Sequence, residues 1–143
     1  LRVCAHLRQP NLMQVLDVFE TEGEVLLICE LLANGSLLDL LQREGAQSES
    51  AARSIIRQIA SGLKAVHEAG IVHRDLKPSN AIINRKGYLQ LSDFGLSGKV
   101  GSTSKSGTRG YWSPETVRRQ PQGAASDWWS LGVTLFPIGV AAF

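Results

Sequence analysis

The segment HRDLKPSN at residues 73–80 is followed at residues 93–95 by the segment DFG. Both segments lie between short strand-like stretches, so two aspartates and an asparagine converge on one part of the fold. An aspartate after an arginine is by itself more often a turn former or a cap than a catalytic group. The ordered pair is a more specific signal than either segment alone, because order and spacing must match as well as the letters.

The residues around these segments predict several short strands. Residues 12–20 alternate partly between apolar and polar types, and residues 24–32 form an aliphatic run. With a turn at residues 21–23, this pattern is typical of two antiparallel strands. Shorter strand-like stretches follow at residues 71–72, 81–83 and 88–91, the last two separated by a turn at 84–87.

Two helices are expected between these strands. Ser36 with Asp39 indicates a capping box, and Gly45 provides the helix stop. Ser48 is the expected N-cap of a longer helix that ends at Gly70 and carries an apolar stripe. The stripe consists of Ala52, Ile55, Ile56, Ile59, Leu63 and Val66.

The composition is that of a globular protein. Of 143 residues, 43% are apolar and 20% are charged, which excludes a disordered tail, a collagen-like fibre and a disulfide-dense mini-protein. The net charge is only +2, and Lys99, Lys105 and Arg109 are diluted by glycine and serine. No basic patch therefore indicates nucleic acid or a membrane surface as a partner. Residues 98–110 predict a mobile loop.

The chain shows no targeting or membrane-spanning segment. No apolar stretch is long enough to cross a bilayer, and the first residues lack the basic start and apolar core of a secretory signal. The chain begins at Leu1 without a methionine, so we expect its natural N-terminus to lie further upstream. Cys4 and Cys29 lie among aliphatic neighbours and are expected to be buried, reduced thiols. These features predict an intracellular location, cytoplasmic with the nucleus as the alternative.

Taken together, the two segments resemble the H-R-D-L-K-P-x-N catalytic loop and the D-F-G motif of eukaryotic protein kinases. SPE at residues 113–115 stands where the family usually has A-P-E. GTRGY at residues 107–111 and DWWSLG at residues 127–132 complete the ordered set. The resemblance is to kinases of the Ser/Thr type, and the tandem tryptophans lean weakly toward the AGC group.

The resemblance implies an α+β fold that is a partial protein-kinase-like fold. It would contain the end of helix C and two strands of the N-lobe, followed by the mainly helical first half of the C-lobe. Residues 1–32 would form the N-lobe remnant and hinge, and residues 33–143 the C-lobe with the catalytic loop and activation segment. The chain has no Gly-rich nucleotide loop and no V-A-I-K lysine, so it would cover about the middle half of a kinase domain.

The resemblance also implies roles for residues of the two segments. Asp75 would orient the substrate hydroxyl and accept its proton. Lys77 would offset charge that develops on the γ-phosphate. Asn80 and Asp93 would hold Mg²⁺ through hard oxygen atoms. The implied cofactors are ATP and Mg²⁺, and the implied partner is a protein substrate.

Further positions in the same register imply a nucleotide site. Glu30 and Leu32 would offer backbone groups to adenine in the hinge. Cys29 would be the gatekeeper behind the base, and Ile82 would pack beneath it. On any other fold these four would be ordinary core residues, so their roles rest on the resemblance.

Residues 93–115 would be the activation segment. Arg74 resembles the arginine that pairs with a phosphate on this segment when an upstream kinase switches the enzyme. Thr108 resembles the residue that hydrogen-bonds the catalytic aspartate and lysine in Ser/Thr kinases, so it favours serine or threonine as the acceptor. Four hydroxyl residues are candidate phosphorylation sites: Ser102, Thr103, Ser104 and Ser106. Of these, Ser104 and Ser106 are favoured because of their distance along the sequence from Thr108.

Other motif positions would have packing or holding roles. His73 and Phe94 resemble the two residues that pack between the lobes, and Asp127 resembles the aspartate that holds the catalytic-loop backbone. Ser36 and Ser79 stand where kinases that prefer basic substrates often carry glutamate. A strong preference for arginine upstream of the target is therefore not expected.

Two positions depart from the family pattern. The arginine that usually pairs with Glu115 is not in the chain, so a buried, unpaired carboxylate is expected there. Pro137 lies inside a last helix that begins near Ala125, where it removes an N–H and clashes with the preceding turn at a cost of about 3 kcal/mol or more. Residues 137–143 are therefore expected to be a kinked helix or a non-native end.

The leading interpretation is a fragment of a Ser/Thr protein kinase, a transferase that moves phosphate from ATP to protein hydroxyls. We expect the fragment to be inactive alone, because the N-lobe motifs are not in the chain. The first alternative is a non-catalytic kinase-like interaction module. The second is a kinase-fold enzyme that acts on small molecules, which residues 107–115 disfavour because they resemble a peptide-docking segment. The substrate, the upstream activator and the oligomeric state stay open.

Overall fold

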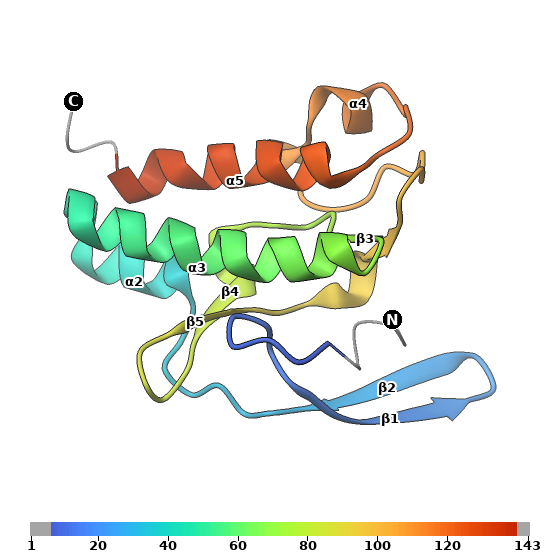
Figure 1. Ribbon diagram of the computed structural model, residues 1–143, viewed down its shortest axis with the longest axis horizontal. Coiled ribbons are helices and arrows are strands. Elements are labelled where there is room, and N and C mark those ends of the chain that lie inside the picture. Colours follow the sequence, from blue (N-terminus) through green and yellow to red (C-terminus); the bar gives the residue numbers. More distant parts are fainter. Residues whose placement is uncertain (1–6, 140–143) are drawn as a thin grey trace.

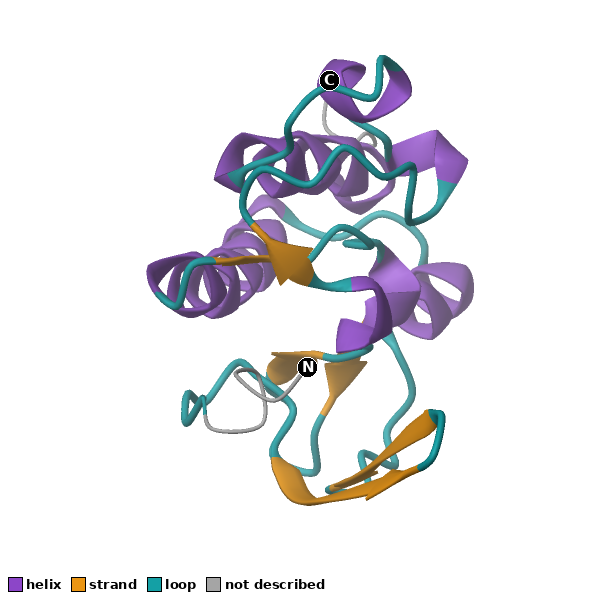
Figure 2. Cartoon of the chain, turned by 90° about the vertical axis from the view of Figure 1, so that its right-hand side faces the viewer, coloured by secondary structure: helices purple, strands orange, loops and turns teal. Residues whose placement is uncertain are grey.

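The computed structural model describes residues 7–139, with the helices gathered on one side and a β-hairpin extending from the other (Figure 1, Figure 2). The hairpin pairs β1 (Val15–Thr21) with β2 (Glu24–Cys29) in antiparallel register. Gly23 forms its turn at a φ of +106°, a backbone that favours glycine. The predicted strand pair is confirmed, although β1 begins later and β2 ends earlier than expected.

Both helices predicted in the first half are confirmed, and each begins at its predicted cap. α2 (Leu37–Glu44) carries the full capping box, since the Ser36 hydroxyl accepts from Asp39 N and the Asp39 carboxylate accepts from Ser36 N. α3 (Glu49–Glu68) begins at Ser48, whose hydroxyl caps the first turn. The apolar stripe of α3 faces the interior, and its buried members are Ile55, Ile59, Leu63 and Val66.

Two further strand pairs flank the segments at residues 73–80 and 93–95. β4 (Ala81–Ile83) pairs with β5 (Leu89–Leu91), and residues 84–87 form the turn between them, as predicted. β3 (Ile71–Val72) pairs with β6 (Gly98–Lys99). The segment predicted to be a mobile loop therefore starts with a short strand, because its first two residues find a ladder partner outside their own sequence neighbourhood.

The core lies where α3 packs against β5 and α5 (Ala124–Gly139). Figure 1 shows α5 running alongside α3. Leu76, in the middle of the segment at residues 73–80, is fully buried in this core and anchors the loop to it. Other members of the core are Leu12, Leu37, Ile59, Leu63, Val66 and Leu91.

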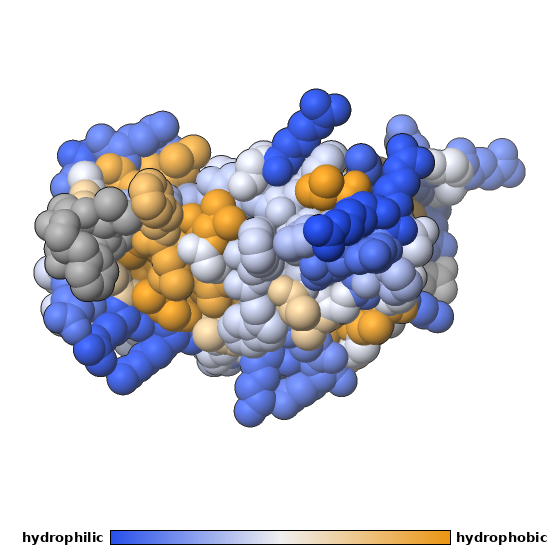
Figure 3. All heavy atoms as spheres, turned by 90° about the horizontal axis from the view of Figure 1, so that it is seen from above, coloured by the Kyte–Doolittle hydropathy of each residue, from blue (hydrophilic) through white to orange (hydrophobic). Residues whose placement is uncertain are grey.

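The last predicted helix is confirmed, and α5 continues through Pro137 to Gly139. The expectation of a kinked or non-native end reaches into residues 140–143, which lie outside the described residues, as do Cys4 and the expected end of helix C. Figure 3 shows apolar surface over this end of α5, where Phe136 is 70% exposed. Within residues 7–139, no helix combines the length and apolar character needed to traverse a bilayer.

Candidate active site

The loop at residues 73–80 leaves β3 and is fixed to the first turn of α5 by one buried carboxylate. Asp127 accepts hydrogen bonds from His73 N at 2.7 Å and from Arg74 N at 2.8 Å. Its Oδ2 also lies 2.8 Å from Nε2 of His67 on α3. The predicted role of Asp127 in holding the loop backbone is therefore confirmed.

Asp75, Lys77 and Thr108 form a closed triangle of polar contacts. Asp75 Oδ1 accepts from Thr108 N at 2.9 Å and from Thr108 Oγ1 at 2.8 Å. Lys77 Nζ lies 2.9 Å from Asp75 Oδ2 and 2.8 Å from Thr108 Oγ1. The structure thus brings together three of the predicted site residues from two separate segments.

These contacts keep the Asp75 carboxylate ionised. Burial alone would raise the pKa of Asp75, but hydrogen bonds from Lys77 and Thr108 outweigh it and lower that pKa below its usual value. At neutral pH the carboxylate is therefore a permanent acceptor. A hydroxyl group brought to it can be oriented by a charge-assisted hydrogen bond.

Asn80 lies beside Ser92, the residue before Asp93, because its backbone carbonyl accepts from Ser92 N at 2.9 Å and from Ser92 Oγ at 3.1 Å. Asn80 Nδ2 donates to Asp75 O at 2.9 Å and to Asp75 Oδ2 at 3.2 Å, which turns its Oδ1 away from Asp75. Asp93 is exposed and adopts a left-handed backbone with a φ of +58°. Its side chain accepts from Gly95 N at 3.3 Å.

This pair of oxygen donors fits Mg²⁺. Mg²⁺ prefers oxygen ligands and is usually held by one or two carboxylates, with phosphates and water completing its coordination. No cluster of three or more His, Cys, Asp or Glu side chains within residues 7–139 could hold a metal by itself. A cation here would therefore depend on Asn80, Asp93 and oxygens from its ligand.

His73 and Phe94 pack against each other, as predicted. Their ring centroids lie 5.0 Å apart, and His73 is fully buried. Its Nε2 lies 3.0 Å from the Ser92 carbonyl oxygen. Complete burial lowers the pKa of His73 despite the nearby Asp127 carboxylate, so the ring is neutral at physiological pH. A neutral, buried ring acts in packing rather than in acid–base chemistry.

Arg74 is held by the segment that follows the DFG motif. Its Nε donates to Leu96 O at 2.6 Å, and its Nη1 donates to Ser102 Oγ and Ser104 Oγ, each at 2.8 Å. Its backbone has a φ of +69°, an uncommon value for a residue with a side chain. Arg74 therefore contacts the hydroxyl of Ser104, one of the two favoured phosphorylation sites, and the phosphorylation itself stays a prediction.

The other favoured serine does not join this cluster. The Oγ of Ser106 is buried and has no hydrogen-bond partner within the described residues, whereas Ser102, which was not favoured, contacts Arg74. Gln122, which no sequence signal indicated, fixes this stretch by donating from Nε2 to Ser104 O at 2.6 Å and from its backbone N to Ser102 O at 2.9 Å. The distance along the sequence to Thr108 does not predict which serines contact Arg74. These contacts depend instead on how the loop folds back.

Gly107 allows Thr108 to reach Asp75. Its φ is +89°, and a Cβ atom added there would lie 2.2 Å from the carbonyl oxygen of Arg74. No side chain fits at that distance, so glycine is required both by the backbone conformation and by the close approach of the two loops. The G in the GTRGY segment therefore has a physical cause.

The structure divides the predicted nucleotide-binding residues into two pairs. Glu30 and Leu32 line a cavity of about 890 Å³, but Cys29 and Ile82 do not. The Glu30 carbonyl and the Leu32 N–H have no hydrogen-bond partner within residues 7–139, so both are open to a ligand. Ile82 is half-buried on β4.

Cys29 differs from the expectation of a buried thiol. It is a free cysteine that is only half-buried, because it lies at the end of a hairpin whose apolar side chains are partly open. Burial, and then the charge of Glu30, raise the pKa of the Cys29 thiol. The thiol is therefore protonated at neutral pH.

The expectation of an unpaired Glu115 carboxylate is wrong. Glu115 lies in α4 (Pro114–Val117), and Ser126 Oγ donates to its Oε1 at 2.6 Å. Burial would raise the pKa of Glu115, but hydrogen bonds from Ser126, from the backbone N–H of Glu115 and from Ser113 together outweigh it and lower that pKa. Ser126, in the first turn of α5, thus provides a hydrogen-bond donor to this carboxylate.

Comparison with known proteins agrees with the site geometry. The protein kinase domain family matches residues 1–141. A calcium/calmodulin-dependent protein kinase type 1 from Macrobrachium nipponense is 37% identical over 142 residues, which cover 95% of this chain and 41% of that protein. The human hormonally up-regulated neu tumor-associated kinase is 36% identical over 139 residues, covering 92% of this chain and 20% of that protein.

A plant relative shows the highest identity of the three. The calcium and calcium/calmodulin-dependent serine/threonine-protein kinase of Oryza sativa subsp. japonica is 43% identical over 134 residues, which cover 89% of this chain and 26% of that protein. The chain therefore spans less than half the length of these relatives. The weak leaning toward the AGC group stays a prediction.

Proposed function

This chain belongs to the protein kinase family, and from that premise we propose that it carries the phosphoryl-transfer residues of a Ser/Thr protein kinase. The observation that carries the proposal is the triangle of Asp75, Lys77 and Thr108. It couples the catalytic loop to the activation segment through contacts of 2.8–2.9 Å, and it surrounds one ionised carboxylate with fixed donors.

The family uses ATP and Mg²⁺, and bound ATP supplies the phosphoryl group. In the proposed reaction, Asp75 orients the substrate hydroxyl and accepts its proton as the hydroxyl oxygen attacks the γ-phosphorus of ATP. The bond from this phosphorus to the β–γ bridging oxygen breaks, and ADP leaves. Lys77, already placed between Asp75 and Thr108, offsets negative charge on the transferred group. Asn80 and Asp93 would hold the metal through the Asn80 Oδ1 and the Asp93 carboxylate, and the metal would neutralise phosphate charge.

The nucleotide base would bind at the hinge. In this proposal residues 1–32 are the N-lobe remnant and hinge, and residues 33–143 belong to the C-lobe. The unpaired backbone groups of Glu30 and Leu32 support adenine binding, with Cys29 as gatekeeper and the half-buried Ile82 beneath the base.

Phosphorylation of Ser104 by an upstream kinase would regulate this site. The Ser104 hydroxyl already lies 2.8 Å from Arg74 Nη1, so a phosphate there would form charge-assisted hydrogen bonds with the guanidinium. Ser106, the other favoured site, has a buried hydroxyl and is the weaker candidate. The free thiol of Cys29 fits a reducing compartment, and we place the reaction in the cytoplasm or nucleus.

The test is ATP-dependent phosphorylation of Ser, Thr and Tyr peptides by the longest natural protein that contains this chain. We expect Ser and Thr peptides to be labelled, and Asp75→Asn to reduce the rate about 10²–10⁴-fold, as loss of a positioned general base does. Asp17→Asn, an exposed change on the hairpin, is the matched control and should leave the rate unchanged.

Two results would contradict the proposal. Labelling of tyrosine alone would exclude the Ser/Thr assignment. Binding of nucleotide and protein partners without any Asp75-dependent turnover would instead favour the non-catalytic interaction module.

A further inference from the structure

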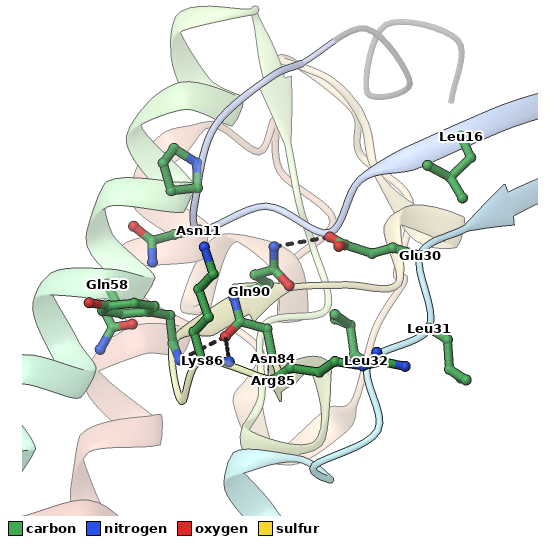
Figure 4. A pocket seen from close by; sticks show the side chains of 12 residues that line it. Asn11, Leu16, Glu30, Leu31, Leu32, Gln58, Asn84, Arg85, Lys86 and Gln90 are labelled. Atoms are coloured by element: carbon green, nitrogen blue, oxygen red, sulfur yellow. Dashed lines mark hydrogen bonds between the residues drawn. The ribbon is translucent and has the colours of Figure 1, made fainter.

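The cavity that Glu30 and Leu32 line lies apart from the proposed phosphoryl-transfer residues. The cavity of about 890 Å³ is bounded by the hinge, by the turn between β4 and β5, and by Gln58 on α3 (Figure 4). Asp75, Lys77, Asn80 and Asp93 do not line it. Its volume is within the range of about 300–1,000 Å³ that is typical of ligand pockets. The cavity is therefore large enough for side chains of a bound molecule.

Gln90 gives this cavity an unsatisfied acceptor. Gln90 Nε2 donates to Glu30 Oε1 at 3.0 Å and to Leu12 O at 3.4 Å, and because both partners are acceptors they fix the orientation of the amide. Its Oε1 is left buried and accepts no hydrogen bond within residues 7–139, although the side chain is only 7% exposed. An unsatisfied buried acceptor costs about 1–3 kcal/mol. A bound N–H donor would remove that cost.

The cations of this cavity lie together on a structured turn. Arg85 and Lys86 are exposed and form no ion pair within the described residues. The turn that carries them is fixed because Asn84 Oδ1 accepts from Lys86 N at 2.9 Å and from Tyr88 N at 3.0 Å. Figure 4 shows Arg85 extending from this turn toward the hinge. These two charges favour an anionic group at this end.

The hinge side of the cavity carries one carboxylate and aliphatic side chains. The Glu30 carboxylate is already engaged there, since it accepts from Gln14 N at 2.9 Å as well as from Gln90. Leu16 and Leu31 add apolar surface and are 62% and 77% exposed. The cavity thus offers a buried hydrogen-bond acceptor, aliphatic surface and two exposed cations.

We propose that this cavity is a docking site for an extended, acidic peptide segment of a partner protein. A backbone N–H of the peptide binds Gln90 Oε1, an aliphatic side chain packs on Leu16 and Leu31, and an acidic side chain pairs with Arg85 and Lys86. Two cations are too few for nucleic acid, whose binding requires an extended row of phosphate contacts. The docking site contains none of the proposed phosphoryl-transfer residues, but it shares Glu30 and Leu32 with the proposed adenine site.

The experiment measures binding of short fluorescent peptides to the chain by anisotropy. The peptides carry one leucine and one glutamate at varied spacing, and matched sets replace the glutamate with glutamine or lysine. We expect binding by some glutamate peptides, and a loss of about tenfold or more for the double variant R85E/K86E, because the charge pair becomes repulsive. The lysine peptide of the same spacing should then bind R85E/K86E better than it binds the unaltered chain.

Two further variants separate docking from general charge and from misfolding. Arg118→Glu changes an exposed cation that does not line the cavity, and it should leave binding unchanged. Leu31→Asp alters a side chain that is 77% exposed, so the fold should survive while binding weakens. Circular dichroism checks that each variant is folded.

Several outcomes would overturn the proposal. The first is no peptide binding at concentrations up to about 1 mM. The second is equal binding of the acidic, neutral and basic peptide sets. The third is a loss of binding in Arg118→Glu as large as that in R85E/K86E. Chemical-shift changes at Gln90 with small-molecule fragments but with no peptide would show a small-ligand pocket instead. Binding by this chain but not by a longer natural protein that contains it would show that the parent covers the cavity itself.

Discussion

The catalytic loop and the β1–β2 hairpin differ in how far other parts of the described structure complete them. In the loop, His73, Asp75 and Asn80 are buried, and each is hydrogen-bonded to groups from other segments. In the hairpin, Phe19 is 52% exposed and Leu26 is 51% exposed. The loop geometry is therefore fixed by tertiary contacts within residues 7–139, whereas the hairpin is held chiefly by its own ladder.

This difference has an energetic meaning. A change in the loop leaves buried polar groups without partners, and each such group costs about 1–3 kcal/mol. A change on the hairpin surface replaces one exposed group with another and costs little. The two regions should therefore respond very differently to substitution.

Asp127→Ala should have the largest effect, because it removes the acceptor of two loop N–H groups. Two buried donors without partners predict a loss of about 2–6 kcal/mol in the free energy of unfolding. Urea unfolding followed by tryptophan fluorescence measures this loss. Asp17→Ala on the exposed face of β1 is the control, and equal losses in the two variants would refute the contrast between loop and hairpin.

Gly107→Ala should disturb the loop more specifically. The added methyl group would meet Arg74 O at 2.2 Å and would also require a φ of +89°, for which backbone strain costs about 1–3 kcal/mol. Gly101→Ala is a close control, since its φ is +95° but nothing lies within 4 Å of the added atom. Amide hydrogen exchange at Thr108 should accelerate only in Gly107→Ala. If exchange at Thr108 accelerated equally in both variants, its cause would be backbone strain and not the contact between the two loops.

The Asp75 triangle predicts a pH dependence. The pKa of Asp75 is lower in the folded chain, so its contribution to stability is present above the unfolded pKa of about 3.9 and is lost as the pH falls through the folded value. Thr108→Val removes one donor, so it should raise the pKa of Asp75 and weaken this acid dependence. NMR titration of the Asp75 carboxyl measures the pKa. A value that stays fixed or falls would mean that Lys77 and the Thr108 N–H alone determine it.

Phe19→Ser should have the smallest effect. Its ring is 52% exposed on the hairpin, so the free energy of unfolding should change by no more than about 0.5 kcal/mol. Leu63→Ala, a fully buried change in α3, is the positive control and should cost about 2–5 kcal/mol. A loss above about 2 kcal/mol for Phe19→Ser would show that the hairpin depends on tertiary packing after all.

Local patterns in the sequence predicted the elements that depend on neighbouring residues. The capping box of Ser36 and Asp39, the apolar stripe of α3 and the turn at residues 84–87 all formed as expected. Each is decided by contacts between residues a few positions apart. The interactions that stabilise these features can therefore be predicted from the local sequence.

Contacts between distant segments were harder to predict without the family pattern. Ser102 and Gln122 joined Arg74 and the activation segment unexpectedly, and Ser126 provided a donor for Glu115. In each case the choice among several hydroxyl and amide groups depended on how a loop folds back. Distance along the chain does not contain that information.

The sequence by itself determined the family, the α+β elements and the identities of the residues that carry the proposed chemistry, because those are fixed by local pattern and by the order of motifs. Only the tertiary structure decided that Ser126 donates to Glu115, that Ser104 rather than Ser106 meets Arg74, and that Gln90 keeps a buried oxygen with no hydrogen-bond partner within residues 7–139. Hydrogen bonds require donor and acceptor to meet within about 3.5 Å. That condition between remote segments is set by packing, not by sequence distance.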